Sequence, residues 1–202
     1  MTKIKLCGLT RPCDIIAANR LEPEYIGFVF APKSRRYVTP EKAGELKKLL
    51  SPEIRAAGVF VDEGPEFIAR LLERGIISAV QLHGCEDEEY IARLRALAAC
   101  PIIKAFCIDS AEDVEKAERS TADHILLDSG QGTGRPFDRG LIKDIKRPYF
   151  LAGGLSPDNV RPAVRELHPF AVDVSSGIET DGVKDETKMA AFVSAVRKED
   201  RS

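Results

Sequence analysis

The 202-residue sequence predicts an α/β fold: a single compact (β/α)8 barrel (a TIM barrel) that takes up residues 1–202. Three observations support this prediction. Short runs rich in β-branched residues alternate with longer stretches of helical period, the runs are continuously apolar, and eight such pairs fill the chain. Eight strands, eight helices and their connections, at typical lengths, need about 200 residues. No room is left for a second domain.

Eight apolar runs are the expected strands. They are apolar on successive residues, as strands buried on both faces of a parallel sheet are. Right-handed crossovers would close eight such strands into a barrel. The competing fold is an open doubly wound sheet, which normally has about five or six strands and would need two of these to be wrong. In chain order the runs are Lys3–Cys7, Tyr25–Phe30, Ala57–Val61, Ser78–Leu82, Ile102–Phe106, His124–Asp128, Tyr149–Ala152 and Ala171–Ser175.

Helix-start signals stand between the runs. Residues 39–41 (Thr-Pro-Glu) and 156–158 (Ser-Pro-Asp) each place a capping hydroxyl before a proline and an acid, and residues 64–66 (Gly-Pro-Glu) are similar. The acidic run Glu86–Glu89 predicts a solvated first helical turn, where the helix dipole favours negative charge. The last helix is expected over Asp185–Arg197.

Composition narrows the function classes. With 30 basic against 32 acidic residues, the net charge of −2 argues against a partner that is a nucleic acid or an anionic membrane. No apolar run approaches the roughly 18–20 residues of a membrane span, and the charged start is not that of a signal peptide. Five cysteines without a Cys-x-x-Cys pair favour a reducing cytoplasm over a disulfide framework or a structural zinc site. We expect a small-molecule substrate and a chain that is a monomer or a homodimer.

The chemistry of a barrel lies at the C-terminal ends of its strands. Two glycine-containing turns there, after the seventh and eighth strands, predict a phosphate site, because glycine lets backbone N–H groups approach an anion closely. Barrels often bind phosphate with these two loops. The expected phosphate-binding residues are Gly153, Gly154, Ser175, Ser176 and Gly177.

Eight short fragments occur in order along the chain: KIKLCGLT, GFVFAPKSRRYVTP, AGVFVDE, AVQLHG, HILLDS, GTGRPFD, LAGGLSPDNV and AVDVSSGIE. Together they resemble phosphoribosylanthranilate isomerase, from about residue 3 to residue 189. That family performs an Amadori rearrangement on a (β/α)8 barrel in tryptophan biosynthesis. The resemblance implies N-(5′-phosphoribosyl)anthranilate as substrate, 1-(2-carboxyphenylamino)-1-deoxyribulose 5-phosphate as product, and neither a cofactor nor a metal.

The rearrangement needs an acid that protonates the ring oxygen and a base that removes the C2 proton of the Schiff base. By the resemblance, Cys7 matches the base and Asp128 the acid. A free thiol has a pKa of about 8.5, so Cys7 would be partly ionised near pH 7 if the site lowers this pKa modestly. Asp128 has to hold its proton at working pH, which requires desolvation or a neighbouring negative charge. The alternatives are a Cys7 that packs as a small hydrophobe and an Asp128 that caps the next turn.

The remaining expected site residues bind the substrate. Arg36 matches the arginine that faces the anthranilate carboxylate, which a guanidinium can grip through two parallel hydrogen bonds; the alternative is a solvated basic loop. Gln81 and Asp173 point into the barrel mouth by the same match, where we expect them to contact sugar hydroxyls. His83 either hydrogen-bonds the substrate or orders its own loop.

The chain departs from the family in one region. Residues 129–136 (SGQGTGRP) form a shorter stretch than in many relatives, and Arg139 stands where the family usually has tryptophan. We expect less complete closure over the substrate and altered packing against the anthranilate ring or the next helix. Neither change touches Cys7 or Asp128.

Two other functions stay open at this point. A different sugar-phosphate isomerase or epimerase would share the glycine turns. A metal-dependent one would need several His and Asp ligands at strand ends, and His83 is the only histidine expected at that face. A non-catalytic barrel that binds a sugar phosphate is the second. Loss of the substrate's anthranilate fluorescence on adding the protein would distinguish conversion from binding.

Overall fold

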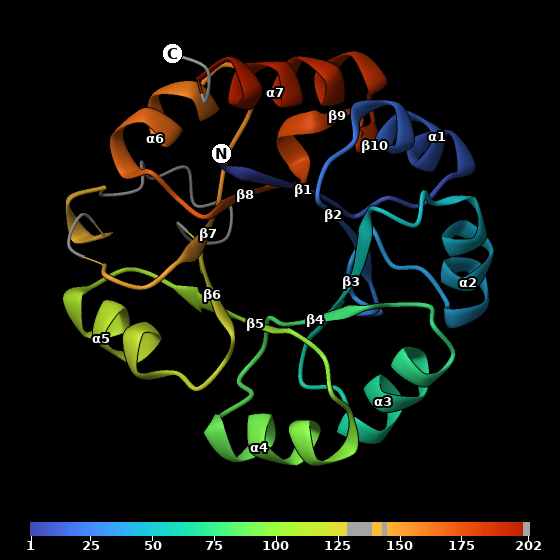
Figure 1. Ribbon diagram of the computed structural model, residues 1–202, viewed down its shortest axis with the longest axis vertical. Helices are drawn as coiled ribbons and strands as arrows, with labels where there is room; N and C mark the ends of the chain where they lie inside the picture. Colours follow the sequence, from blue (N-terminus) through green and yellow to red (C-terminus); the bar gives the residue numbers. More distant parts are fainter. Residues whose placement is uncertain (129–138, 143–144, 200–202) are drawn as a thin grey trace.

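The computed structural model describes residues 1–128, 139–142 and 145–199, and its centre is a closed barrel of eight parallel strands (Figure 1). Strand β1 pairs with β2 on one side and with β8 on the other, which closes the ring. The (β/α)8 prediction is therefore confirmed, and the open doubly wound alternative is wrong. The strands are β1 Lys3–Cys7, β2 Tyr25–Val29, β3 Arg55–Phe60, β4 Ala79–Leu82, β5 Ile102–Cys107, β6 His124–Asp128, β7 Tyr149–Ala152 and β8 Ala171–Val174.

Helices surround the barrel (Figure 1). After β6, the described residues contain a 3-10 turn, η1 Arg139–Ile142, where the sequence predicts a helix. The shortened stretch 129–136 and the Phe137-Asp138 pair lie outside the described residues, as does the side chain of Arg139. The α-helices within the described part are α1 Pro12–Leu21, α2 Pro40–Leu49, α3 Pro65–Glu73, α4 Glu88–Leu97, α5 Ala111–Arg119, α6 Val160–Leu167 and α7 Glu186–Glu199. None of the described helices is long and apolar enough to cross a lipid bilayer.

The predicted helix starts are right for α2 and α3 and wrong for α6. Thr39 accepts a hydrogen bond from the backbone N–H of Lys42 and caps α2, and Gly64 precedes Pro65 at the start of α3. Helix α6 begins at Val160, after a turn in which Asn159 Oδ1 accepts from the N–H of Ser156. Asn159 Nδ2 also donates to the carbonyl of Gly154, so this turn is attached to the expected phosphate loop.

The barrel interior changes from apolar to polar along the strands. Side chains alternate between the two faces of a strand. On β1, Ile4 and Leu6 pack in the large cluster under the helices, which turns Lys5 and Cys7 inward. Tyr25, Leu126 and Phe150 fill the interior with other apolar side chains. Polar interior residues gather instead toward the C-terminal ends of the strands.

After β8 the chain makes two small elements that the sequence did not predict. The 3-10 turn η2 (Ser176–Ile178) leads into a hairpin of β9 (Glu179–Thr180) and β10 (Val183–Lys184). This hairpin precedes α7 and brings Glu179 and Lys184 to the barrel mouth.

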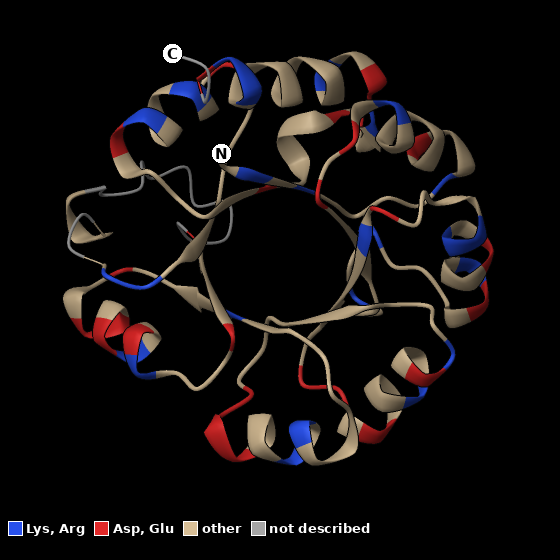
Figure 2. Cartoon of the chain, in the orientation of Figure 1, with Lys and Arg blue, Asp and Glu red and all other residues tan. Residues whose placement is uncertain are grey.

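Most charged residues of the described chain lie on the helices and loops around the barrel, as Figure 2 shows.

Candidate active site

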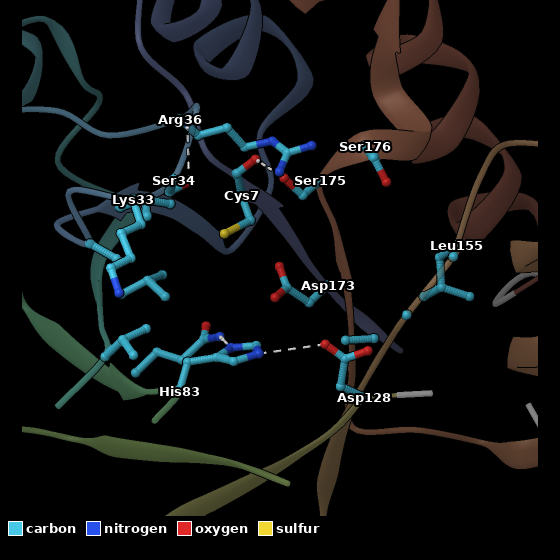
Figure 3. A pocket seen from close by; sticks show the side chains of 18 of the residues that line it. Cys7, Lys33, Ser34, Arg36, His83, Asp128, Leu155, Asp173, Ser175 and Ser176 are labelled. Atoms are coloured by element: carbon cyan, nitrogen blue, oxygen red, sulfur yellow. Dashed lines mark hydrogen bonds and ion pairs between the residues drawn. The ribbon is translucent and has the colours of Figure 1, made fainter. Parts of the chain in front are cut away.

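A cavity of about 970 Å³ opens at the C-terminal ends of the strands. Its wall contains every site residue predicted above except Gly177, which lies directly after Ser176. Side chains from opposite parts of the ring thus meet in one space (Figure 3). The location agrees with the rule that barrel enzymes carry their sites at this face.

Cys7 ends β1 and is 7% exposed. A side chain on Gly27 of the neighbouring strand would come within 2.7 Å of the Cys7 sulfur, so the bare glycine makes room for the thiol. Burial raises the pKa of Cys7 above its ordinary value, while the positive charges of Lys5 and Lys184 act against this rise. The condition of a lowered pKa is therefore not met in this structure, because desolvation and the Asp173 carboxylate outweigh the nearby cations.

Asp128 ends β6, and its carboxylate faces the cavity opposite Cys7 in Figure 3. His83 Nε2 lies 3.5 Å from Asp128 Oδ2, and Gln81 Nε2 lies 3.0 Å from His83 Nδ1. If the Gln81 amide donates to Nδ1, the proton of a neutral imidazole sits on Nε2 and faces the carboxylate. The Gln81 Oε1 atom is buried without a hydrogen-bond partner among the described residues, which leaves an acceptor at the cavity wall.

Arg36 lies on the loop after β2 and makes a two-pronged ion pair with Glu179 of β9. Its Nε donates to Oε1 at 2.6 Å and its Nη2 donates to Oε2 at 2.9 Å. Arg35 and Lys184 donate to the same carboxylate, so one buried anion holds three cations. The hydrogen bond with Glu179 raises the pKa of Arg36. Sequence reasoning missed Glu179, which lies 143 residues away along the chain.

The two glycine turns come together as expected for an anion site. Gly153 and Gly154 have positive φ angles of 89° and 60°. A Cβ on Gly177 would lie 1.9 Å from the carbonyl oxygen of Leu155, so the loop after β8 packs directly on the loop after β7. Ser176 begins the short 3-10 turn η2, and a short extra helix with these two loops forms the phosphate site of many barrels.

A second buried ion pair, between Glu86 and Lys104, fixes two loops of the mouth. Lys104 Nζ lies 3.0 Å from Glu86 Oε2 and donates to the carbonyl of Gly84 at 2.7 Å. Glu86 accepts from the N–H groups of Asp62 and Gly84. The prediction that residues 86–89 all lie in solvent is wrong for Glu86, whose side chain is 1% exposed. Lys104 within the apolar run Ile102–Phe106 was the available signal, since a charge in a buried strand needs a partner.

No group of three His, Cys, Asp or Glu side chains within residues 1–128, 139–142 and 145–199 is arranged to hold a metal ion. What the cavity does offer is a thiol, a carboxylate next to an imidazole, an arginine and a glycine-lined loop pair. Proton transfer on a small anionic substrate is the chemistry that such groups can perform.

Comparison with known proteins agrees with this arrangement. The chain matches the family model described as N-(5'phosphoribosyl)anthranilate (PRA) isomerase over residues 4–195. A curated relative from Clostridium acetobutylicum, named N-(5'-phosphoribosyl)anthranilate isomerase, is 44% identical over 207 residues, with 98% of this chain and 99% of the relative covered. The crystal structure of phosphoribosyl anthranilate isomerase from Thermotoga maritima is similar at a TM-score of 0.91 and 37% identity, covering 98% of this chain and 100% of that one. A structure of such an isomerase in complex with reduced 1-(o-carboxyphenylamino)-1-deoxyribulose 5-phosphate matches at a TM-score of 0.88 and 37% identity, with the same coverage.

Proposed function

The chain belongs to the N-(5'-phosphoribosyl)anthranilate isomerase family and is thus an enzyme of tryptophan biosynthesis, and we propose that it isomerises its substrate with Cys7 as general base and Asp128 as general acid. The observation that supports this assignment is the entry of the thiol and the carboxylate into one cavity from different sides of the barrel (Figure 3). A sugar held between them would meet the two groups on opposite faces.

Asp128 acts first in this scheme. Its carboxyl proton goes to the furanose ring oxygen, the C1–O bond breaks, and the nitrogen lone pair forms the C=N bond of the Schiff base. The carboxylate left behind lies 3.5 Å from His83 Nε2, which can stabilise the new negative charge. His83 would in this way serve the acid as well as its own loop.

Cys7 acts second. Its thiolate removes the proton from C2, and the electrons of the C2–H bond form the C1–C2 double bond of an enolamine as the Schiff-base nitrogen regains its lone pair. The enolamine then gains a proton at C1 and loses one from the C2 hydroxyl to give the ketone. No electrons enter or leave the molecule, so general acid–base catalysis is sufficient.

The substrate's two anionic ends have separate places on the barrel. The phosphate would bind N–H groups of the loops after β7 and β8, where Gly153, Gly154, Ser175, Ser176 and Gly177 lie. The anthranilate carboxylate would bind the part of the Arg36 guanidinium that Glu179 leaves free. Because β8 and β2 flank β1, these two places stand on either side of Cys7. The sugar hydroxyls between them would meet Asp173 and the free acceptor of Gln81.

The proposal is tested by adding the purified protein to freshly made phosphoribosylanthranilate and following the anthranilate fluorescence. Conversion is expected to remove the fluorescence at a rate proportional to enzyme concentration, at neutral pH and in the presence of a chelator. A sugar-phosphate-binding barrel would instead give at most a stoichiometric change. We also assign the reaction to the cytoplasm, where the free cysteines would stay reduced.

A further inference from the structure

Lys5 is a buried lysine that the chemistry above does not use. Its side chain is fully buried inside the barrel, in the middle of β1. Placing an ammonium group in such a position is strongly unfavourable unless an anion and good hydrogen bonds compensate. Lys5 Nζ donates to both oxygens of Asp173, at 2.9 Å each.

The geometry places this ammonium beside the thiol as well. Lys5 and Cys7 are two residues apart on β1 and point to the same side of the strand. Lys5 is also the register partner of Asp173 on β8. An ammonium group has three N–H donors, and two of them go to Asp173. The third N–H of Lys5 is therefore available toward Cys7. The charge of Lys5 also acts on the Cys7 thiol.

Within the part of the chain that the structure describes, four charged groups have a marked effect on the Cys7 sulfur. They are Lys5 from its own strand, Asp173 from β8, Lys184 from β10 and Arg36 from the loop after β2. Lys184 and Arg36 both bind the Glu179 carboxylate, so part of their charge is already compensated outside the barrel. Strand β2 contributes Gly27, which carries no charge.

We propose that Lys5 is a positioning residue for the catalytic base: its buried ammonium holds the Asp173 carboxylate in place and supplies positive charge that favours the thiolate of Cys7. The inference rests on the proposed role of Cys7. A positive charge in a dry interior acts more strongly on a neighbour than the same charge in water. Lys5 thereby offsets part of the desolvation that would otherwise keep Cys7 protonated.

The test measures thiolate formation without using turnover. In a Cys13→Ser background, which removes the other cysteine of the same tryptic peptide, the rate of Cys7 alkylation by iodoacetamide is followed by mass spectrometry between about pH 7 and pH 10. Lys5→Met is compared with Lys104→Met, because Lys104 is also a buried lysine paired with a carboxylate and, unlike Lys184, is not among the charges that act on Cys7. Both variants lose a similar interaction, so general loosening of the barrel would affect them alike.

We expect Lys5→Met to slow Cys7 alkylation at pH 8 by about tenfold or more. An adjacent positive charge commonly lowers the pKa of an acidic group by at least about one unit, and its removal reduces the thiolate fraction accordingly. The difference should narrow as the pH rises, and Lys104→Met should alkylate at the parent rate. If Lys5→Met instead hindered the reagent from reaching the thiol, the difference in rate would persist at every pH, and this result would contradict the proposal. Equal rates for folded Lys5→Met and its parent would also overturn it.

Lys5→Met leaves Asp173 as an unpaired buried anion, so this variant could fail to fold. The double variant Lys5→Met/Asp173→Asn removes both charges and is compared with Asp173→Asn alone. The proposal expects the double variant to alkylate about tenfold more slowly than Asp173→Asn. Equal rates in this pair would refute the role of Lys5, whatever the isomerase assay of either variant shows.

Discussion

Arg36 and Glu179 form a two-pronged ion pair that joins the loop after β2 to the hairpin after β8, with the Arg36 guanidinium at the cavity wall. The Glu179 side chain is 4% exposed, and it also holds Lys184. The pair therefore fixes how the guanidinium is presented to a bound carboxylate. Because Arg35 contacts the same carboxylate from an exposed position, the structure provides a natural control.

Replacing Arg36 by methionine should raise KM for phosphoribosylanthranilate more than it lowers kcat. Loss of a charge-assisted hydrogen bond to a carboxylate removes about 1.5–3 kcal/mol of binding free energy, which corresponds to a rise in KM of roughly tenfold to a hundredfold. Steady-state kinetics measure the effect, and Arg35→Met should stay close to the parent. An unchanged KM in Arg36→Met would show that the anthranilate carboxylate binds elsewhere.

Glu179 should make the stability of the enzyme sensitive to acid. Burial acts to raise its pKa, but hydrogen bonds from Arg36 and Lys184 prevail and lower it. The unfolded chain therefore binds this proton more readily than the folded one. The contribution of Glu179 is present above its unfolded pKa of about 4.3 and is lost as the pH falls through the folded value.

Urea unfolding at about pH 6, 4 and 3 measures this dependence. The free energy of unfolding of the wild type should fall more steeply toward low pH than that of Glu179→Gln, which has no carboxyl group to protonate there. Parallel curves for the two proteins would contradict the assignment of this acid sensitivity to Glu179.

Glu86 should be important for stability although it belongs to an acidic run that looks solvated. Glu86→Ala leaves Lys104 unpaired in the interior and frees the loops of Asp62 and Gly84, at a loss of about 3–5 kcal/mol. Glu89→Ala, at an exposed position of the same run, should change the free energy of unfolding by less than about 0.5 kcal/mol. Similar losses of unfolding free energy in both variants would show that the Glu86–Lys104 pair does not stabilise the fold more than an exposed glutamate does.

Gly177→Ala should damage the phosphate loops. The added Cβ would collide with the carbonyl oxygen of Leu155, so the loop after β8 has to move away from the loop after β7. We expect a loss of about 1–3 kcal/mol in stability and weaker inhibition by inorganic phosphate. Gly44→Ala, in α2, meets only ordinary contacts with Ile76 and should gain up to about 1 kcal/mol with phosphate inhibition unchanged. Unaltered phosphate inhibition in Gly177→Ala would place the phosphate elsewhere.

The barrel could be predicted because its strands are marked locally. Each of the eight runs is short and largely apolar and precedes a stretch of helical period, and His124–Asp128 and Tyr149–Ala152 are strands at the predicted bounds. Residues at or just after the C-terminal end of a strand lie at the mouth of the barrel, which is why the predicted site residues gather around one cavity. The start of α6 was wrong because residues 156–158 form a turn closed by Asn159 instead of the first helical turn.

The partners of the charged residues could not be predicted, because they depend on contacts between distant segments. Arg36 meets Glu179, and Lys5 meets Asp173, 168 residues away. A basic loop and an isolated lysine in a strand give no indication of which carboxylate they will bind. The direction of the Cys7 pKa likewise follows from how completely the thiol is buried and which charges surround it, and both are properties of the folded molecule.

The central claim is that Cys7 and Asp128 transfer the protons of the isomerisation. The most direct measurement is the turnover of fresh phosphoribosylanthranilate by the wild type, Cys7→Ser and Asp128→Asn, with the thermal melt of each protein recorded alongside. We predict that each variant loses at least about a hundredfold in kcat while its melting temperature stays near that of the wild type. A folded variant of either residue that retains nearly full turnover would contradict the claim.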